Sequence, residues 1–320
     1  MKEIGGYMSL DEACGTEYHH DAIALNTAAN CLRYIIRARK IQKIYIPYFL
    51  CSSVMRACVR ENCEYEYYHI NKSFIPLFNK ELKSNEYLYV VNFYGQVNVA
   101  LIKDLKDRYN NVIVDNVQAF FNVPIDNIDT LYSCRKFFGV PDGAYLYTDN
   151  KLKELLEIDV SNSRMEHILG RYEQTAQEYY SVYSENEKKM GQEPIKLMSK
   201  LTRNLMKSID YERIKKRRTD NFKYLHNELK SINKLDLTVP EGAFMYPLYI
   251  ENGMELKKKL IHNNIFVPTL WKDVFDIVGK ESLEYDLAEK IVPLPIDQRY
   301  DIKDMEYIVE NIRRGVTDER

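Results

Sequence analysis

Strand-like and helix-like segments alternate through the first half of the chain, and this alternation limits the possible folds more than any other feature. The apolar run 22–25 leads into a helical pattern over 28–39. Further strand-like runs lie at 43–47, 64–70, 86–95, 111–115, 129–133 and 144–148, and further helical runs at 52–61 and 101–109. Strands separated by helices predict βαβ units, and therefore an α/β fold with a mainly parallel sheet flanked by helices.

The second half of the chain has a different pattern. Residues 164–230 are largely helical and highly charged, and 211–230 predict one long exposed helix whose basic residues 215–218 face solvent. Beyond it, strand-like runs lie at 235–240, 244–250 and 265–271, and helical runs at 255–264 and 303–314. A chain of 320 residues exceeds the usual size of a single core. We therefore expect a large α/β domain at 1–215 and a smaller α+β domain at 216–320.

Composition and charge argue against several classes of partner. The 45 basic and 47 acidic residues give a net charge of −2, which provides no electrostatic case for nucleic acid. Residues 1–15 contain no apolar signal core, and no apolar run approaches the roughly 20 residues that span a bilayer. None of the six cysteines lies at metal-ligand spacing to a histidine. We expect a soluble cytoplasmic protein with reduced thiols, no metal site and no membrane contact.

Polar residues follow three strands of the predicted sheet, at the edge where parallel sheets bind ligands. Asp115 ends the strand 111–115, and a carboxylate there caps a helix, pairs with a cation or serves a ligand. Asn26 and Thr27 precede a helix, so they are ordinary caps or part of an anion site. Lys136 lies in an aromatic, lightly charged stretch between two strands. It is either an exposed loop charge or, in an apolar pocket, a nucleophile toward aldehydes.

One cofactor needs all three of these features. Pyridoxal 5′-phosphate (PLP) requires a phosphate cradle, a carboxylate that keeps its pyridine nitrogen protonated, and a lysine for its aldehyde. The chain has neither a G-x-x-x-x-G-K-[ST] nor a G-x-G-x-x-G segment, so nucleotide-phosphate and dinucleotide folds have no direct support. The sequence therefore predicts a PLP site.

Longer segments of the chain, over roughly residues 4–315, resemble the DegT/DnrJ/EryC1/StrS family of PLP-dependent aminotransferases. VIVDNVQAF (112–120) resembles the family's V-I-E-D-A-A-Q-A strand end, and SCRKFFGVPDGAYLYTD (133–149) its S-x-x-K…G-E-G-G…T-D segment. ALNTAANCL (24–32), KIYIPYFLCSSVMRA (43–57) and VNFYGQ (91–96) are similar to its phosphate segment, its P-x-x-T-x-x-A-T turn and its H-x-Y-G-Q motif. The resemblance implies the aspartate-aminotransferase fold, which is fold type I of the PLP-dependent transferases.

The resemblance also implies a role for each matching residue. Lys136 would bind the cofactor's aldehyde covalently and then act as acid and base. Asp115 would pair with the pyridine nitrogen, and Gln118 would approach the ring hydroxyl. The phosphate would be bound by Asn26, Thr27 and Ser133. On the substrate side we expect Tyr94 and also Trp271, which is placed there by its position after a strand-like run; the alternative for Trp271 is a core or domain-interface anchor.

Several positions depart from the family's pattern. Asn26 stands where the family has glycine, and Cys51 stands where it often has an aromatic residue over the cofactor. The G-E-G-G turn is replaced by Pro-Asp-Gly-Ala at 141–144, and Ser133 precedes the lysine by three residues, whereas many family members place it five before. The chain therefore resembles a divergent branch of the family.

The expected activity is transfer of an amino group from glutamate to a keto-sugar or nucleotide-linked keto-sugar, in the biosynthesis of cell-surface polysaccharide or a related sugar. The resemblance implies a homodimer that acts on small molecules. One alternative is another PLP reaction on the same scaffold, such as dehydration or racemisation. The other is a non-catalytic homologue with an interaction or regulatory role, which the altered positions favour and the retained Asp115, Gln118 and Lys136 oppose.

Overall fold

A computed structural model describes residues 4–317, and its centre is an eight-stranded sheet in the order β1-β8-β7-β6-β5-β2-β3-β4. The neighbours β7, β6, β5, β2 and β3 run parallel, whereas β8 and β4 run antiparallel to the strands beside them. The strands are β1 (Ile23–Leu25), β2 (Lys43–Pro47), β3 (Glu64–Ile70), β4 (Pro76–Leu77), β5 (Glu86–Val91), β6 (Val112–Asp115), β7 (Asp129–Ser133) and β8 (Ala144–Tyr147). The predicted α/β fold with a mainly parallel sheet is confirmed.

Helices of the first half pack on this sheet. α1 (Ala28–Arg39) lies against β1, β7 and β8 and beside α2 (Ser52–Arg60), whereas α3 (Val99–Tyr109) lies against β6. The start of α1 is fixed by Thr27, whose side chain accepts a hydrogen bond from the backbone N–H of Asn30 at 3.0 Å. The three helices agree with the periodicity of the sequence to within two residues at each end, because each has an apolar face to bury.

One predicted strand, 86–95, is four residues too long. β5 ends at Val91, and Phe93–Gly95 form a short 3₁₀ helix in which Tyr94 has a φ of +53°. Asn92 ends the strand, because its side chain accepts a hydrogen bond from the backbone of Val97 at 2.9 Å and donates one to Asn116 at 3.0 Å. The sheet therefore stops before the tyrosine that the sequence suggested as a substrate contact.

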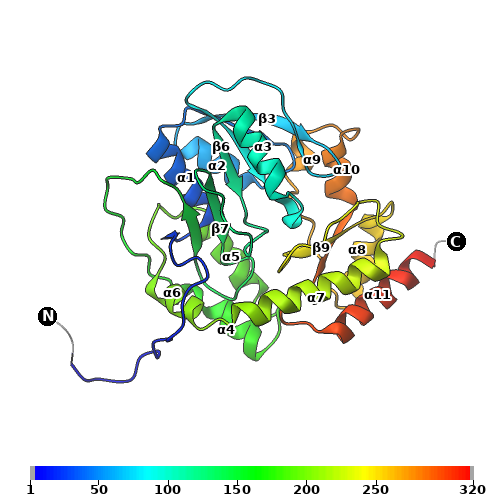
Figure 1. The fold of residues 1–320 in the computed structure, drawn as a ribbon. Helices are drawn as coiled ribbons and strands as arrows, with labels where there is room; N and C mark the ends of the chain where they lie inside the picture. The colour runs from blue at the N-terminus through cyan, green and yellow to red at the C-terminus, as the bar shows by residue number, and fades with distance from the viewer. Residues whose placement is uncertain (1–3, 318–320) are drawn as a thin grey trace.

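The later helices form the rest of the molecule. They are α4 (Glu166–Glu173), α5 (Tyr180–Met190), α6 (Lys200–Lys207), α7 (Tyr211–Leu229), α8 (Gly253–His262), α9 (Val274–Ile277), α10 (Leu283–Lys290) and α11 (Ile302–Thr317), with a 3₁₀ turn at Asn162–Arg164. Figure 1 shows α7 crossing the molecule beside α11. The expectation of a wholly solvated basic face on α7 is wrong for Arg218, which is only 1% exposed. The expected domain boundary at 215/216 falls inside α7, so the division of the chain stays a prediction.

Strand pairing in the C-terminal part differs from the prediction. β9 (Met245–Tyr249) lies where expected, but its antiparallel partner is β10 (Ile291–Pro295), a strand that the sequence pattern did not predict. Pro293 and Pro295 have no backbone N–H to donate, which argues against a strand in a sheet interior. In a two-stranded sheet each strand has a free edge, and proline is tolerated there.

The strand predictions at 235–240 and 265–271 are wrong. In the first segment, the backbone N–H groups of Leu235 and Thr238 donate to the side chains of Asn233 and Gln96, so a strand ladder does not form. The second segment contains Pro268 and ends at Trp271, whose φ of +54° is left-handed. Apolar alternation in these segments reflects packing against the core, not pairing with another strand.

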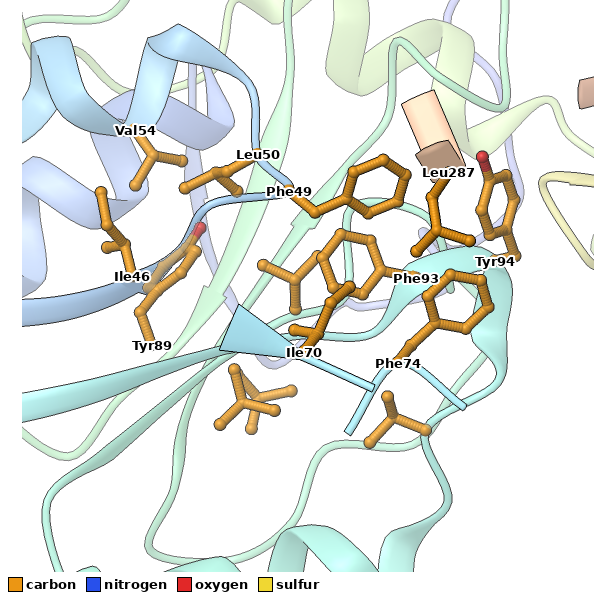
Figure 2. Close-up of a cluster of buried hydrophobic side chains, with 14 of the residues drawn as sticks. Ile46, Phe49, Leu50, Val54, Ile70, Phe74, Tyr89, Phe93, Tyr94 and Leu287 are labelled. Carbon is orange, nitrogen blue, oxygen red and sulfur yellow. The ribbon is translucent and has the colours of Figure 1, made fainter. Parts of the chain in front are cut away.

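A continuous hydrophobic core joins the sheet to the C-terminal part. Figure 2 shows Leu287 of α10 beside Phe49, which follows β2, and Phe93, which follows β5. The same cluster includes Phe74 and Tyr94, and all five side chains are at most 2% exposed. This packing holds C-terminal segments against the carboxyl edge of the sheet. No helix within residues 4–317 has the length and apolarity needed to cross a bilayer.

Candidate active site

A cavity of about 550 Å³ opens at the carboxyl ends of the central parallel strands. Val91 ends β5, Asp115 ends β6 and Ser133 ends β7, and all three residues line it. The first residues of α1 and α2 form a neighbouring part of the wall, and α5 and the loop that carries Trp271 contribute the remainder. The cavity therefore lies at the edge where parallel sheets bind ligands.

Asp115 is a buried carboxylate in the wall of this cavity. It is 4% exposed, and among residues 4–317 no Lys, Arg or His forms an ion pair with it. The Tyr89 hydroxyl donates to Oδ2 at 2.6 Å, and the backbone N–H of Val117 donates to Oδ1 at 2.8 Å. Burial raises the pKa of Asp115, while the hydrogen bond from Tyr89 and the charge of Lys136 act in the opposite direction. A cationic group that enters the cavity would find a counter-charge here.

Lys136 lines the same cavity from the loop between β7 and β8. Its ammonium nitrogen lies 5.5 Å from the centre of the Phe244 ring. Lys136 is exposed in the single chain, which agrees with the first of the two alternatives that the sequence left open, a loop charge, and not with a lysine enclosed in an apolar pocket. The structure nevertheless brings the amine and the Asp115 carboxylate to one space.

Gly143 ties the lysine loop to the segment before α1. Its φ is +115°, and a Cβ atom at this position would lie 3.0 Å from Thr202 Cγ2 and 3.2 Å from Cys134 Sγ. The backbone N–H of Gly143 donates to the carbonyl of Asn26 at 2.7 Å, and its carbonyl accepts from the backbone of Cys134 at 3.1 Å. The glycine that the sequence placed in a tight turn is therefore required by backbone angle and by space.

The N-terminus of α1 opens onto the cavity. Thr27, Ala28 and Ala29 line it, and Thr27 is also the N-cap of the helix. Both readings of this residue from the sequence, cap and part of an anion site, are compatible with its position. The first backbone N–H groups of a helix have no intrahelical acceptor, so this end of α1 is suited to bind an anion.

Asn26 does not line the cavity. It is fully buried, and its side chain donates to the carbonyl of Pro194 at 3.1 Å and accepts from Asn30 at 2.8 Å. Its amide therefore connects the start of α1 to the segment after α5. A direct contact between the Asn26 side chain and a phosphate is not supported by this geometry.

Gln118 lines the cavity, whereas Tyr94 lies behind it. The side-chain oxygen of Gln118 accepts a hydrogen bond from the backbone N–H of Tyr94 at 2.8 Å, which fixes the orientation of the amide. The Tyr94 ring is 1% exposed and packs on Phe74 and Trp271, with centroids 5.7 and 5.8 Å away. Tyr94 is thus a core residue that positions Gln118 through its backbone, and the structure does not place it at the substrate.

Trp271 and Cys51 both line the cavity. The indole packs against Phe49, with centroids 4.3 Å apart, so it is a core anchor and a wall residue at once. Its loop is held to α2 by Asp273, whose carboxylate accepts a hydrogen bond from the backbone of Ser52 at 3.2 Å. An aromatic surface therefore borders the site even though Cys51 stands where the family often has an aromatic ring.

Several charged lining residues were not predicted. Arg135 forms an ion pair with Glu187 of α5, and Lys188 of the same helix also lines the cavity. From α2 comes Arg56, whose guanidinium donates to the Ser52 hydroxyl at 2.7 Å. Arg135 could have been suspected as the neighbour of Lys136. The residues of α5 carry no local signal, because only the tertiary fold brings that helix to the sheet edge.

The fold is that of the PLP-dependent aminotransferases, which confirms the predicted architecture. An aminotransferase of the DegT/DnrJ/EryC1/StrS type from Brucella abortus superimposes with a TM-score of 0.62 at 14% identity, over 91% of this chain and 85% of that one. Further similar structures are DesV from S. venezuelae in complex with a ketimine intermediate, and NtdA from Bacillus subtilis with bound PMP. DesV has a TM-score of 0.65 at 13% identity, over 94% of this chain and 85% of its own. NtdA has a TM-score of 0.66 at 13% identity, over 92% of this chain and 73% of its own.

By sequence, no family model and no curated protein matches the chain. The resemblance seen in short sequence segments is thus matched by solved structures of the same kind, whose superposition at 13–14% identity shows the fold alone. In this fold the cavity at the strand ends holds the candidate residues Asp115, Ser133 and Lys136.

Proposed function

We propose that this chain is a PLP-dependent aminotransferase of the DegT/DnrJ/EryC1/StrS type. One observation carries the proposal: a buried carboxylate with no ion-pair partner among residues 4–317, an amine and a helix N-terminus face a single cavity. These are the groups that PLP needs for its pyridine nitrogen, its aldehyde and its phosphate. The solved structures of similar fold, which include one with bound PMP, support the same assignment.

The residues present fit this cofactor. Asp115 would hold the pyridine nitrogen, whose positive charge would compensate the burial that now raises the pKa of the carboxyl group. The N-terminus of α1, with Thr27 and Ser133, would bind the phosphate. Gln118, with its amide oriented by Tyr94, would face the ring hydroxyl. PLP supplies an electron sink when bound, and Lys136 Nζ would bind its aldehyde and move the proton between substrate and cofactor carbons.

The substrates follow from the same resemblance. The amino donor would be glutamate, and the acceptor a keto-sugar, free or linked to a nucleotide, in a cytoplasmic pathway of sugar biosynthesis. Trp271 would border the acceptor. A homodimer is part of the proposal, because Lys136 is exposed in the single chain and because α4 and α5 carry exposed apolar side chains. These side chains are Leu169, Tyr172, Tyr180 and Tyr183.

Cofactor binding is the first property to measure. The purified wild-type protein and Lys136→Ala would be mixed with PLP, and their visible absorbance recorded before and after borohydride reduction. The proposal expects a lysine-dependent band in the wild type only, and peptide mapping should place the reduced cofactor on Lys136. Exchange of the amino group with glutamate would then be tested on the loaded protein. If wild type and variant give the same spectrum, the enzymatic proposal fails, and a non-catalytic homologue becomes the better account.

A further inference from the structure

We propose that Arg218 is a positioning residue for Lys136, acting through the carbonyl group of Phe137 and the ring of Phe244. This inference rests on the proposed function, since it concerns the lysine that would bind the cofactor. Arg218 belongs to α7, far from Lys136 in sequence, and it lies outside the wall of the cavity. Its role would be to hold the backbone that carries the reactive amine.

The backbone next to the lysine is held by two donors from the C-terminal half. Phe137 directly follows Lys136, and its carbonyl accepts a hydrogen bond from Arg218 Nη2 at 3.1 Å and another from Gln298 Nε2 at 2.7 Å. The two donors are themselves joined, because Arg218 Nε donates to Gln298 Oε1 at 2.8 Å. The three groups form a closed cycle of hydrogen bonds around one carbonyl oxygen.

The side chain of the lysine is bordered by a residue that Arg218 also holds. Arg218 Nη1 donates to the carbonyls of Ala243 and Phe244 at 3.0 and 3.3 Å. The Phe244 ring lies 5.5 Å from Lys136 Nζ and 5.7 Å from the Phe137 ring. The guanidinium itself stacks 4.7 Å above the Phe137 ring. One buried side chain thus fixes both neighbours of the lysine, one along the chain and one through space.

The hydrogen-bond acceptors around Arg218 suit a guanidinium group better than the ammonium group of a lysine. Arg218 is 1% exposed, and its hydrogen bonds go to three backbone carbonyls and one amide. Burial lowers the pKa of the guanidinium to about 10, so it stays charged at neutral pH, and the charge of nearby Asp297 acts in the opposite direction. A planar fork can reach several acceptors at once, which the single ammonium of a lysine cannot do. A buried cation is costly in free energy, and here the cost is offset by four hydrogen bonds and by the charge of nearby Asp297.

Such a clamp matters because a reactive amine must be placed accurately. A displacement of about 1 Å in a reacting group can lower a rate by roughly 100-fold. Lys136 stands on a loop and is exposed, so its own packing does not fix it. The hydrogen bonds to the Phe137 carbonyl would add to those within the loop, where the backbone N–H groups of Phe137 and Phe138 donate to the carbonyl of Cys134 at 3.0 and 2.9 Å.

The test uses four full-length variants. Arg218→Lys keeps the charge but not the fork. Gln298→Leu removes both the acceptor for Arg218 and the donor to Phe137, whereas Gln298→Glu keeps an acceptor for Arg218, loses the donor to Phe137 and adds a negative charge. Arg217→Lys is the matched control, because Arg217 is the exposed neighbour on the same helix. For each protein, the melting temperature, the dissociation constant for PLP and the rate of appearance of the lysine-dependent absorbance band are measured.

A positioning role predicts a specific combination of results. Arg218→Lys and both Gln298 variants should form the band about tenfold more slowly, as expected for losing contacts that orient a reacting group. Their affinity for PLP should change less than about threefold, since other residues bind the phosphate and the pyridine ring. Arg217→Lys should match the wild type in every measurement.

The opposing results are distinct. If folded variants form the band at the wild-type rate, or if rate and PLP affinity fall together, Arg218 has no positioning role and only supports the fold. If Arg218→Lys does not fold, the partly exposed Gln298 decides through its two variants. If the wild type forms no band, the proposed function fails, and the positioning role of Arg218, which rests on it, fails as well. A wild-type band with unaffected variants overturns the positioning role alone.

Discussion

Two parts of the cavity wall differ in origin. One consists of strand ends and the loop that follows them, with Asp115, Ser133 and Lys136. The other consists of α5 and the loop before α9, with Glu187, Lys188 and Trp271. Except for Trp271, the second wall was not predicted from the sequence. The residues suited to hold the proposed cofactor lie at or just after strands that the sequence predicts. The other part of the wall comes from segments that only the tertiary structure brings to the cavity.

The comparison makes a prediction about function. In the proposed mechanism, the strand-end wall touches the reacting atoms, and the helical wall touches the substrate. Substitutions in the first wall should therefore reduce turnover most, and those in the second wall should act mainly on substrate affinity.

The largest effect should come from Lys136→Ala. Removal of the amine takes away both the attachment of the cofactor and the proton carrier, so turnover should fall by roughly 1,000-fold or more. The measurement is conversion of bound PLP to its amine form by an amino donor. Lys188→Ala is the matched control from the other wall, and it should lose less than about tenfold. Equal losses in the two variants would break the division between the walls.

Asp115→Asn should lower turnover by about 100-fold, because a neutral amide holds the pyridinium charge less well. The stability of the cofactor-free protein should respond differently. Burial raises the pKa of Asp115, so its ionised form costs free energy in the folded state at neutral pH. The free energy of unfolding should therefore fall by no more than about 1 kcal/mol, the value of the one hydrogen bond that the amide cannot accept.

The pH dependence checks the sign of this argument. A raised pKa in the folded state gives a penalty that is full above that pKa and is lost as pH falls toward the unfolded value of about 3.9. Wild type should therefore gain stability relative to Asp115→Asn as the pH is lowered from neutral. Urea unfolding of both cofactor-free proteins at several pH values measures the difference in their free energies of unfolding. If the wild type instead loses stability relative to Asp115→Asn as the pH falls, the carboxylate is not buried in its ionised form.

Trp271→Ala should act mainly on substrate binding. Loss of the indole removes an aromatic wall of the cavity, so KM for the acceptor should rise about tenfold while kcat changes less. Trp271→Phe keeps an aromatic ring against Phe49 and serves as the control for packing. Steady-state kinetics on any accepted keto-sugar provides both constants. A fall in kcat with unchanged KM would place Trp271 with the strand-end wall.

The smallest effect is expected from Glu187→Gln. It removes the ion pair between α5 and Arg135, both partly exposed, and such pairs contribute little and weaken with salt. Turnover should change less than about threefold at low salt, and the difference from wild type should shrink further as salt is added. A large, salt-independent loss would mean that α5 takes part in the chemistry.

Sequence patterns predicted the sheet well and the C-terminal strands poorly, for a physical reason. Strands such as 86–91 and 112–115 are buried on both faces, so their apolar runs, YLYVV and VIV, are unambiguous. β10 contains two prolines and was missed, and the run 265–271 looked like a strand but packs without a partner strand. Strand pairing depends on which distant segments lie side by side in the folded chain, and the local sequence pattern does not contain that information.

The candidate site shows the same limit at the level of residues. Asp115, Gln118, Ser133, Thr27 and Lys136 were predicted and all line the cavity. Asn26 and Tyr94 were predicted and do not, because their side chains are used in packing and in hydrogen bonds with other segments. A sequence position shows that a residue is near a strand end but does not show which way its side chain points.

By itself the sequence determined the α/β class, the succession of strands and helices along the first half of the chain, and the polar residues at the carboxyl ends of the strands. These depend on local periodicity, burial and turn chemistry, which neighbouring residues decide. Tertiary structure alone decided that α5 completes the cavity, that Arg218 is buried against the lysine loop, and that β9 pairs with β10. Those contacts join segments far apart in the chain, and their free energy arises only when the whole core packs.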